Sequence, residues 1–163
     1  MIGVAVLLGI FAILQKRAVD SGAGKAPPIV GKTLDGQTFD LSTRSGKLTM
    51  VNFWATWCGP CRMEFPDLIK LQEKYGERGF TVVGIVQEGP EAEAEAKQVA
   101  EDSKLNYPNL MITPEIAAGY SQVNSLPTSF LIDGNGKVVF QYVGVDPADP
   151  PLQKFGREIE ARL

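Results

Sequence analysis

The sequence predicts an α/β fold in which a central mixed β-sheet is flanked by helices. Two apolar runs, 48–55 and 80–86, are rich in β-branched and aromatic residues, as expected for strands buried on both faces. An amphipathic helical stretch joins them, and this order is typical of a parallel strand–helix–strand unit. Nearer the C-terminus, two further strand-like runs flank Gly134-Asn135-Gly136 and predict an antiparallel hairpin.

A small β-hairpin is expected before the first buried strand. The dipeptide Asp35-Gly36 separates the runs 29–34 and 37–41, and Asp-Gly between two such runs favours a tight turn. After the strand 48–55, the stretch 61–75 has the residue spacing of an amphipathic helix. Its expected apolar positions are Met63, Leu68, Leu71 and Tyr75.

The rest of the chain supplies two more helices and the C-terminal hairpin. An Ala- and Glu-rich stretch over 90–104 predicts a helix that starts at a proline, inside a long insertion over 90–120. The hairpin strands are expected at 128–133 and 137–143, and a last helix at about 151–162. A length of 163 residues without an internal repeat predicts one domain.

The N-terminus differs from the rest of the chain. Residues 1–14 are all apolar or glycine, and two basic residues end the run. A helix of this length spans about 21 Å, which is less than the ~30 Å hydrocarbon core and closer to a signal-peptide core. We predict a membrane anchor or signal segment at 1–17, a Gly- and Pro-rich linker at 18–28, and one domain at 29–163. The alternative is an ordinary buried first helix.

Charge and cysteine content exclude several classes of function. Sixteen Lys and Arg against nineteen Asp and Glu give a net charge of −3, which leaves no positive field to attract nucleic acid. Two cysteines and no histidine are too few ligands for a structural zinc site. The lack of histidine also excludes a Cys-His protease pair and a Cys-x-x-Cys-His haem attachment. We therefore expect no metal, no cofactor and no nucleic-acid partner.

The two cysteines, Cys58 and Cys61, lie three positions apart between the buried strand and the helix. A disulfide between them closes almost no loop and would stabilise the fold little, so this setting favours a redox pair. If Cys58 caps a helix that starts at Gly59, the helix dipole lowers the pKa of its thiol. We expect Cys58 to attack and Cys61, one turn later on the same face, to resolve the mixed disulfide. Pro60 suits the first turn, where its missing N–H costs nothing, and Gly59 leaves room for a partner's backbone.

The residues around this pair resemble the thioredoxin superfamily. The resemblance is carried by Val-Asn-Phe-Trp-Ala-Thr-Trp-Cys-Gly-Pro-Cys at 51–61. Within that superfamily, Arg-Met-Glu-Phe-Pro at 62–66 is most similar to the membrane-anchored TlpA/ResA branch, as are the opening hairpin and the insertion. The resemblance covers about Ala26 to Leu163. It implies a thioredoxin-like fold, thiol–disulfide oxidoreductase activity and a periplasmic or otherwise extracytoplasmic domain.

The same resemblance implies a substrate-binding surface. Residues 125–128, Ser-Leu-Pro-Thr, align with the superfamily's cis-proline segment, which implies a cis Leu126–Pro127 bond beside Cys58. Backbone groups there would pair with an extended substrate, whereas the alternative is a trans proline that ends a loop. Trp57 is expected either to shield the disulfide or to contact the substrate. The expected substrate-binding residues are Trp57, Gly59, Pro60, Leu126 and Pro127.

One position departs from the plain thioredoxin pattern. Where that pattern has a buried Asp beneath the second cysteine, this chain has Asn52, and an amide cannot transfer the proton. The TlpA/ResA pattern places an acidic residue near the cysteine pair, and Glu88 falls there. We expect an apolar pocket to raise the pKa of Glu88, which would take the proton from Cys61. The alternative is a solvated Glu at the start of a loop.

We therefore predict a membrane-tethered reductase of protein disulfides. The resemblance implies apocytochrome c as a candidate substrate and a membrane electron donor as a second partner. The alternatives are a general thioredoxin, a disulfide-forming oxidant, and a non-catalytic module that holds a peptide. A peroxidase is disfavoured because Cys58 does not lie in a Pro-x-x-x-Thr/Ser-x-x-Cys setting. If the N-terminal run inserts as it stands, Lys16 and Arg17 favour a cytoplasmic domain, so the sequence leaves the side of the membrane open.

Overall fold

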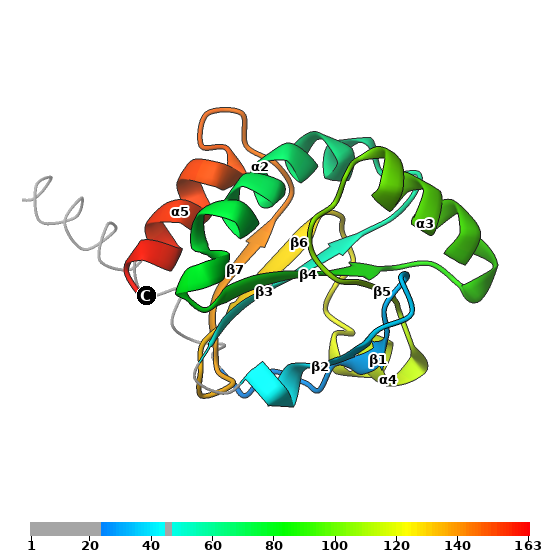
Figure 1. Ribbon diagram of the computed structural model, residues 1–163, viewed down its shortest axis with the longest axis horizontal. Helices are drawn as coiled ribbons and strands as arrows, with labels where there is room; N and C mark the ends of the chain where they lie inside the picture. Colours follow the sequence, from blue (N-terminus) through cyan, green and yellow to red (C-terminus); the bar gives the residue numbers. More distant parts are fainter. Residues whose placement is uncertain (1–23, 45–46) are drawn as a thin grey trace, which may run out of the picture.

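A five-stranded mixed sheet forms the centre of the molecule (Figure 1). The computed structural model describes residues 24–44 and 47–163, so the predicted anchor at 1–17 lies outside the described residues. The strand order is β5-β4-β3-β6-β7. The strands are β3 (Leu48–Trp54), β4 (Phe80–Val86), β5 (Asn109–Met111), β6 (Thr128–Ile132) and β7 (Val138–Val143). β3 pairs in parallel with β4, which pairs in parallel with β5, whereas β6 is antiparallel to both its neighbours. The predicted mixed sheet is confirmed.

Helices and a hairpin cover the two faces of this sheet (Figure 1). Cores shared with the sheet place α2, α3 and α5 on one face. These helices are α2 (Gly59–Tyr75), α3 (Glu93–Asp102) and α5 (Pro151–Glu160), with the 3-10 turns η2 (Gly76–Arg78) and η3 (Pro90–Ala92) before β4 and α3. The other face carries the predicted hairpin of β1 (Val30–Lys32) and β2 (Thr38–Asp40), the 3-10 turn η1 (Leu41–Arg44), and α4 (Pro114–Gly119). Within the described ranges, no helix combines the length and apolar character needed to cross a membrane.

Strand β3 is buried along its whole length, which explains why its sequence is apolar except at Thr49 and Asn52. Successive side chains of a strand point to opposite faces. Leu48 and Met50 pack in the core beneath α2 and α5, whereas Val51 and Phe53 pack in the core beneath the hairpin and α4. The buried polar side chains of β3 therefore belong to different faces, since Thr49 points toward the hairpin and Asn52 toward α2.

The predicted apolar stripe of α2 is wrong at one position. Met63 is 72% exposed, whereas Glu64 and Phe65 are buried. The helix starts at Gly59, and Cys61 is the first residue on its buried side. Counting 3.6 residues per turn from Cys61 reaches Glu64 and Phe65 and leaves Met63 on the solvent side. A carboxyl group therefore occupies a position where an apolar side chain is expected.

Two segments hold more structure than their composition predicts. The insertion contains the edge strand β5 as well as helices, and Leu110 in β5 bridges to Thr33 after β1. The last residues of the expected linker are packed onto the domain. Ala26 N–H donates to the Gly136 carbonyl at 2.8 Å, and the Tyr120 hydroxyl donates to the Pro27 carbonyl at 3.2 Å. Contacts of the domain therefore begin before Ile29.

Candidate active site

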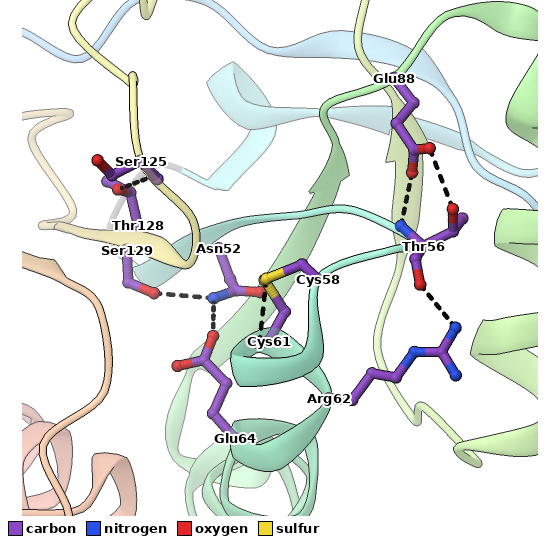
Figure 2. The surroundings of a disulfide bond; sticks show 10 residues. All are labelled: Asn52, Thr56, Cys58, Cys61, Arg62, Glu64, Glu88, Ser125, Thr128 and Ser129. Carbon is purple, nitrogen blue, oxygen red and sulfur yellow. Dashed lines mark hydrogen bonds between the residues drawn. A yellow bond between two sulfur atoms is a disulfide. The ribbon is translucent and has the colours of Figure 1, made fainter.

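The two cysteines form a disulfide at the N-terminus of α2 (Figure 2). Their Cα atoms are 5.3 Å apart. Cys58 is the N-cap residue with an extended backbone, and its Sγ accepts a hydrogen bond from the Cys61 N–H at 3.2 Å. Pro60 lies in the first turn of the helix. The predicted cap is confirmed, and the helix N-terminus will stabilise negative charge on the Cys58 sulfur when the disulfide is reduced.

The two sulfurs differ in how far solvent can reach them. Cys58 keeps 3% of its surface exposed, whereas Cys61 is fully buried. Trp57 beside it is 71% exposed, and Gly59 and Pro60 are also exposed. A Cβ added at Gly59 would have no atom within 4 Å, so the surface next to Cys58 is open to a partner. An incoming disulfide can therefore reach Cys58 and not Cys61.

The Leu126–Pro127 peptide bond is cis, as the resemblance implies. Leu126 packs against the apolar cluster that contains both cysteines. The Pro127 carbonyl accepts from the Gly144 N–H at 2.7 Å, which joins this segment to the chain after β7. No hydrogen bond of the Leu126 backbone is present among the described residues. Its N–H and carbonyl groups are therefore available to an extended chain lying over Cys58.

A buried carboxyl group lies beneath the disulfide, and sequence reasoning missed it. Glu64 is 2% exposed and follows Cys61 by three residues, so the two side chains share one face of α2. Glu64 Oε1 accepts from Asn52 Nδ2 at 2.6 Å, and the same amide group donates to Ser129 Oγ at 2.9 Å. Figure 2 shows Asn52 between Glu64 and the cysteine pair. Asn52 Oδ1 is buried and has no partner within the part of the chain that the structure describes.

Burial raises the pKa of Glu64 to about 8. The hydrogen bond from Asn52 opposes this rise, and the negative charge of Asp67 adds to it. A carboxyl group with a pKa in this range can both accept and release a proton near neutral pH.

Glu88, which the sequence predicted as the proton acceptor, follows β4, and its carboxylate contacts the loop that contains Thr56. Its two oxygens accept from the Thr56 N–H at 2.5 Å and from the Thr56 hydroxyl at 3.0 Å. Arg62 Nη2 donates to the Thr56 carbonyl at 2.6 Å from the other side. Figure 2 shows this carboxylate directed at Thr56. The three contacts fix the loop that leads into Trp57 and Cys58.

One signal in the sequence could have identified Glu64. Residues three positions apart lie on the same face of a helix. If Cys61 faces the interior, a charged residue three positions later faces the interior too. The Arg62 contact, by contrast, depends on how the loop before the helix folds, and no spacing rule indicates it. No group of three or more His, Cys, Asp or Glu side chains in 24–44 and 47–163 is placed to hold a metal ion.

Comparison with known proteins agrees with this site. A family model described as the AhpC/TSA family matches residues 23–141. Thiol-disulfide oxidoreductase ResA of Bacillus thuringiensis (strain Al Hakam) is 34% identical over 143 residues, which is 88% of this chain and 80% of that protein. Thioredoxin-like protein YneN of Bacillus subtilis (strain 168) is 33% identical over 136 residues, which is 83% of this chain and 79% of that protein.

A solved structure supports the same assignment. The thiol:disulfide interchange protein of the thioredoxin family from Chlorobium tepidum TLS superposes with a TM-score of 0.75 at 34% identity. The superposition covers 88% of this chain and 98% of that one. The residues 23–141 that the family model matches include the hairpin, the insertion and the cysteine pair. The chain belongs to the AhpC/TSA family and, within it, to the ResA-like thiol–disulfide oxidoreductases with a thioredoxin-like fold.

Proposed function

We propose that this oxidoreductase works as a reductase of disulfides in other proteins, with Cys58 as the attacking sulfur. The observation that carries the proposal is the asymmetry of the pair. Cys58 caps α2 and retains exposed surface, whereas Cys61 is buried. The helix N-terminus favours the thiolate on Cys58, and the open surface beside Gly59 admits the partner.

The exchange proceeds in two displacements. The Cys58 thiolate attacks one sulfur of the partner's disulfide, forms a mixed disulfide, and releases the other partner sulfur as a thiolate. Cys61 then loses its proton and attacks the Cys58 sulfur. This second step forms the Cys58–Cys61 disulfide and releases the partner's remaining sulfur. Two electrons pass from the pair to the partner in each turnover.

We assign the proton of the second step to Glu64. Its carboxyl group shares the buried face of α2 with Cys61, and burial brings its pKa to about 8. As a carboxylate it accepts the Cys61 proton, and a general base with a pKa near the working pH accelerates such a step. Glu88 stabilises the Thr56 loop and so positions Cys58. The proton transfer expected of Glu88 stays a prediction, which the pH profile of Glu88→Gln tests.

The partner is proposed to bind as an extended chain along the cis-proline segment. The free N–H and carbonyl groups of Leu126 would add a short strand pairing, as in other β-augmentation complexes. Exposed Trp57, next to Cys58 in the chain, and the side chain of Leu126, which packs against the cysteine cluster, offer apolar contacts. Gly59 and Pro60 complete the contact surface.

The cellular setting is also a proposal. We propose that the apolar segment 1–17 tethers the domain to the membrane on its extracytoplasmic side. Reducing equivalents would then come from a membrane electron donor, and apocytochrome c is the proposed substrate. Resemblance to the TlpA/ResA branch supports this placement.

Trapping tests the substrate class and the compartment together. In Cys61→Ser the resolving sulfur is absent, so partners should accumulate as mixed disulfides on Cys58 in the native cell. Cys58→Ser is the matched control and should trap nothing. Partners identified as apocytochromes support the proposed pathway, whereas an absence of trapped protein contradicts a protein reductase.

The reduction potential tests the direction of transfer. A value near that of thioredoxin, about −270 mV, supports a reductant, and a value near −120 mV indicates a disulfide-forming oxidant. Equilibration of the full-length chain with glutathione or dithiothreitol buffers gives this number.

A further inference from the structure

The side-chain oxygen of Asn52 is an unused hydrogen-bond acceptor beneath the cysteine pair. Asn52 is fully buried in β3, and its Oδ1 atom has no partner within the part of the chain that the structure describes. The nitrogen end of the same amide is fully used, because its two N–H groups donate to Glu64 Oε1 at 2.6 Å and to Ser129 Oγ at 2.9 Å. One end of this side chain is therefore satisfied and the other is not.

The two donor bonds fix the direction in which the oxygen points. In the sheet, Asn52 lies between Ser129 of β6 and Gly84 of β4. Its nitrogen is turned toward Ser129 and Glu64, and Gly84 brings no side chain on the other side. Figure 2 shows the oxygen end of the amide directed at the cysteine pair. The free acceptor therefore faces the two sulfurs.

Reduction of the disulfide creates a donor on this side of the amide. In the disulfide neither sulfur carries a hydrogen, so Oδ1 has nothing to accept from the pair. Two electrons and one proton convert the disulfide into a Cys58 thiolate, which the helix N-terminus favours, and a Cys61 thiol. Cys61 is fully buried, so its S–H group needs an acceptor inside the protein. The Trp54 indole N–H does not compete, because it already donates to Asn109 Oδ1 at 3.0 Å.

We propose that Asn52 Oδ1 accepts a hydrogen bond from the Cys61 thiol in the reduced chain, and that this contact shifts the equilibrium of the pair toward the reduced form. The oxidised chain is destabilised by a buried unpaired acceptor, and reduction supplies its donor. A thiol is a weak donor, so the gain comes chiefly from satisfying the amide oxygen.

Asn52 is thereby a positioning residue for the exchange reaction. Its oxygen holds the Cys61 thiol, and its nitrogen holds Glu64, to which we assign the thiol proton. In the resolving step the S–H bond breaks, its electron pair stays on the Cys61 sulfur, and the proton moves to a carboxylate oxygen of Glu64. This inference deepens the proposed function and rests on its assignment of Cys61 as the buried thiol of the reduced pair.

The reduction equilibrium with dithiothreitol tests the proposal in the full-length chain. Two dithiothreitol thiols supply the electrons and become a cyclic disulfide. Asn52→Leu keeps the size of the side chain but has no acceptor, and its equilibrium constant at pH 6 should favour the protein disulfide by about fivefold or more over wild type. A tenfold change corresponds to ~30 mV. At pH 6 Glu64 stays protonated in both proteins, because its pKa is about 8 and loss of the Asn52 hydrogen bond raises it further.

Ser129→Ala is the matched control. It removes a partner from the nitrogen end of the same amide and leaves Oδ1 in place. Its equilibrium constant should stay within about twofold of wild type, because no acceptor for the thiol is lost. An unchanged constant in Asn52→Leu, or equal shifts in Asn52→Leu and Ser129→Ala, would overturn the proposal.

Infrared spectroscopy tests the hydrogen bond itself. In Cys58→Ser the chain keeps one cysteine, so its S–H stretching band belongs to Cys61. This band should lie at a lower wavenumber than that of an alkyl thiol in an apolar solvent, and adding Asn52→Leu should return it to the unbonded position. A band at the unbonded position while Asn52 is present contradicts the proposal, as does a lowered band that Asn52→Leu leaves in place.

A measurement on the wild-type chain decides if Asn52→Leu does not fold. With ¹³C-labelled asparagine, the reduced-minus-oxidised infrared spectrum should show a side-chain carbonyl band that moves to lower wavenumber on reduction. Absence of such a band refutes the contact. None of these measurements uses a partner protein, so their failure leaves the trapping result of the proposed function untouched, and failure of trapping leaves the hydrogen bond intact.

Discussion

Replacing Glu64 with Gln should remove a pH dependence from the folding stability of this protein. Glu64 is buried in contact with Asn52, and its pKa is raised from 4.5 to about 8. Gln has the shape of a protonated Glu and can still accept the hydrogen bond from Asn52. The substitution therefore removes the ionisation and keeps the packing.

The sign follows from proton binding. Between pH 4.5 and about 8 the folded chain holds a proton on Glu64 that the unfolded chain has released. The stability that this proton provides is complete below pH 4.5 and is lost as the pH rises through about 8. At ~1.36 kcal/mol per pKa unit, the rise in the pKa of Glu64 corresponds to a loss of roughly 5 kcal/mol in the free energy of unfolding between pH 4.5 and about 8. The free energy of unfolding of Glu64→Gln should therefore lie within about 1 kcal/mol of the wild-type value at pH 4. At pH 9 it should exceed the wild-type value by several kcal/mol.

Urea denaturation of the oxidised full-length chain between pH 4 and 9, followed by tryptophan fluorescence, measures this difference. The disulfide keeps both cysteines from titrating, so Glu64 is the ionising group of the site that remains. Glu73→Gln is the matched control, because Glu73 is an exposed carboxylate on the same helix. Its stability should run parallel to wild type at every pH.

The reduced enzyme gives a second readout. Decay of the mixed disulfide on Cys58 should slow as the pH falls below about 8 in wild type, because Glu64 must be ionised to accept the Cys61 proton. General-base contributions are typically ~10²–10⁴-fold, so Glu64→Gln should slow this step by about 10²-fold or more. A Glu64→Gln variant whose stability runs parallel to wild type from pH 4 to 9 would falsify the buried ionisation. An unchanged decay rate would remove Glu64 from the proton transfer.

Two further substitutions test other contacts of the structure. Glu88→Gln should slow exchange by no more than about tenfold, because the Gln oxygen can still accept from the Thr56 N–H and its amide group can donate to the Thr56 hydroxyl, so only the charge that strengthens both hydrogen bonds is lost. Stopped-flow rates across pH should keep the wild-type inflection, and a shifted inflection would assign the proton to Glu88. Gly84→Ala should lower the free energy of unfolding by about 2–4 kcal/mol, since its Cβ would lie 1.9 Å from Asn109 Oδ1 and 2.8 Å from Trp54 Nε1, which share a 3.0 Å hydrogen bond. Denaturant titration measures that loss, and a value within about 0.5 kcal/mol of wild type contradicts it.

Most elements were predictable because their signals are local. β3 and β4 are largely apolar runs rich in β-branched and aromatic residues, and Asp35-Gly36 marks the hairpin turn. β5 was not predicted. It has three residues, too few for any periodicity, and becomes a strand because β4 on one side and the segment after β1 on the other supply its partners. Such a strand exists only once its neighbours are in place.

The error at Met63 has a related cause. Hydropathy counted Met63 as core, but the direction of the helix face is set by where α2 docks on the sheet. That docking places Glu64 inside and Met63 in solvent. Residue type alone would place Met63 in the core and Glu64 in solvent, which is the reverse of their observed burial.

The sequence by itself determined the fold class and the position of the redox pair. A cap at Cys58 and a second sulfur within disulfide distance at Cys61 follow from spacing within one helical turn, which the chain sets locally; the division of roles between the two sulfurs is our proposal. Only the tertiary structure decided which carboxylate meets which group. Glu64 meets Asn52 across 12 residues and Glu88 meets Thr56 across 32, and both contacts form only when the helix and the sheet pack together. Since a carboxyl pKa depends on burial and on such distant partners, the acid–base part of the site belongs to the folded chain.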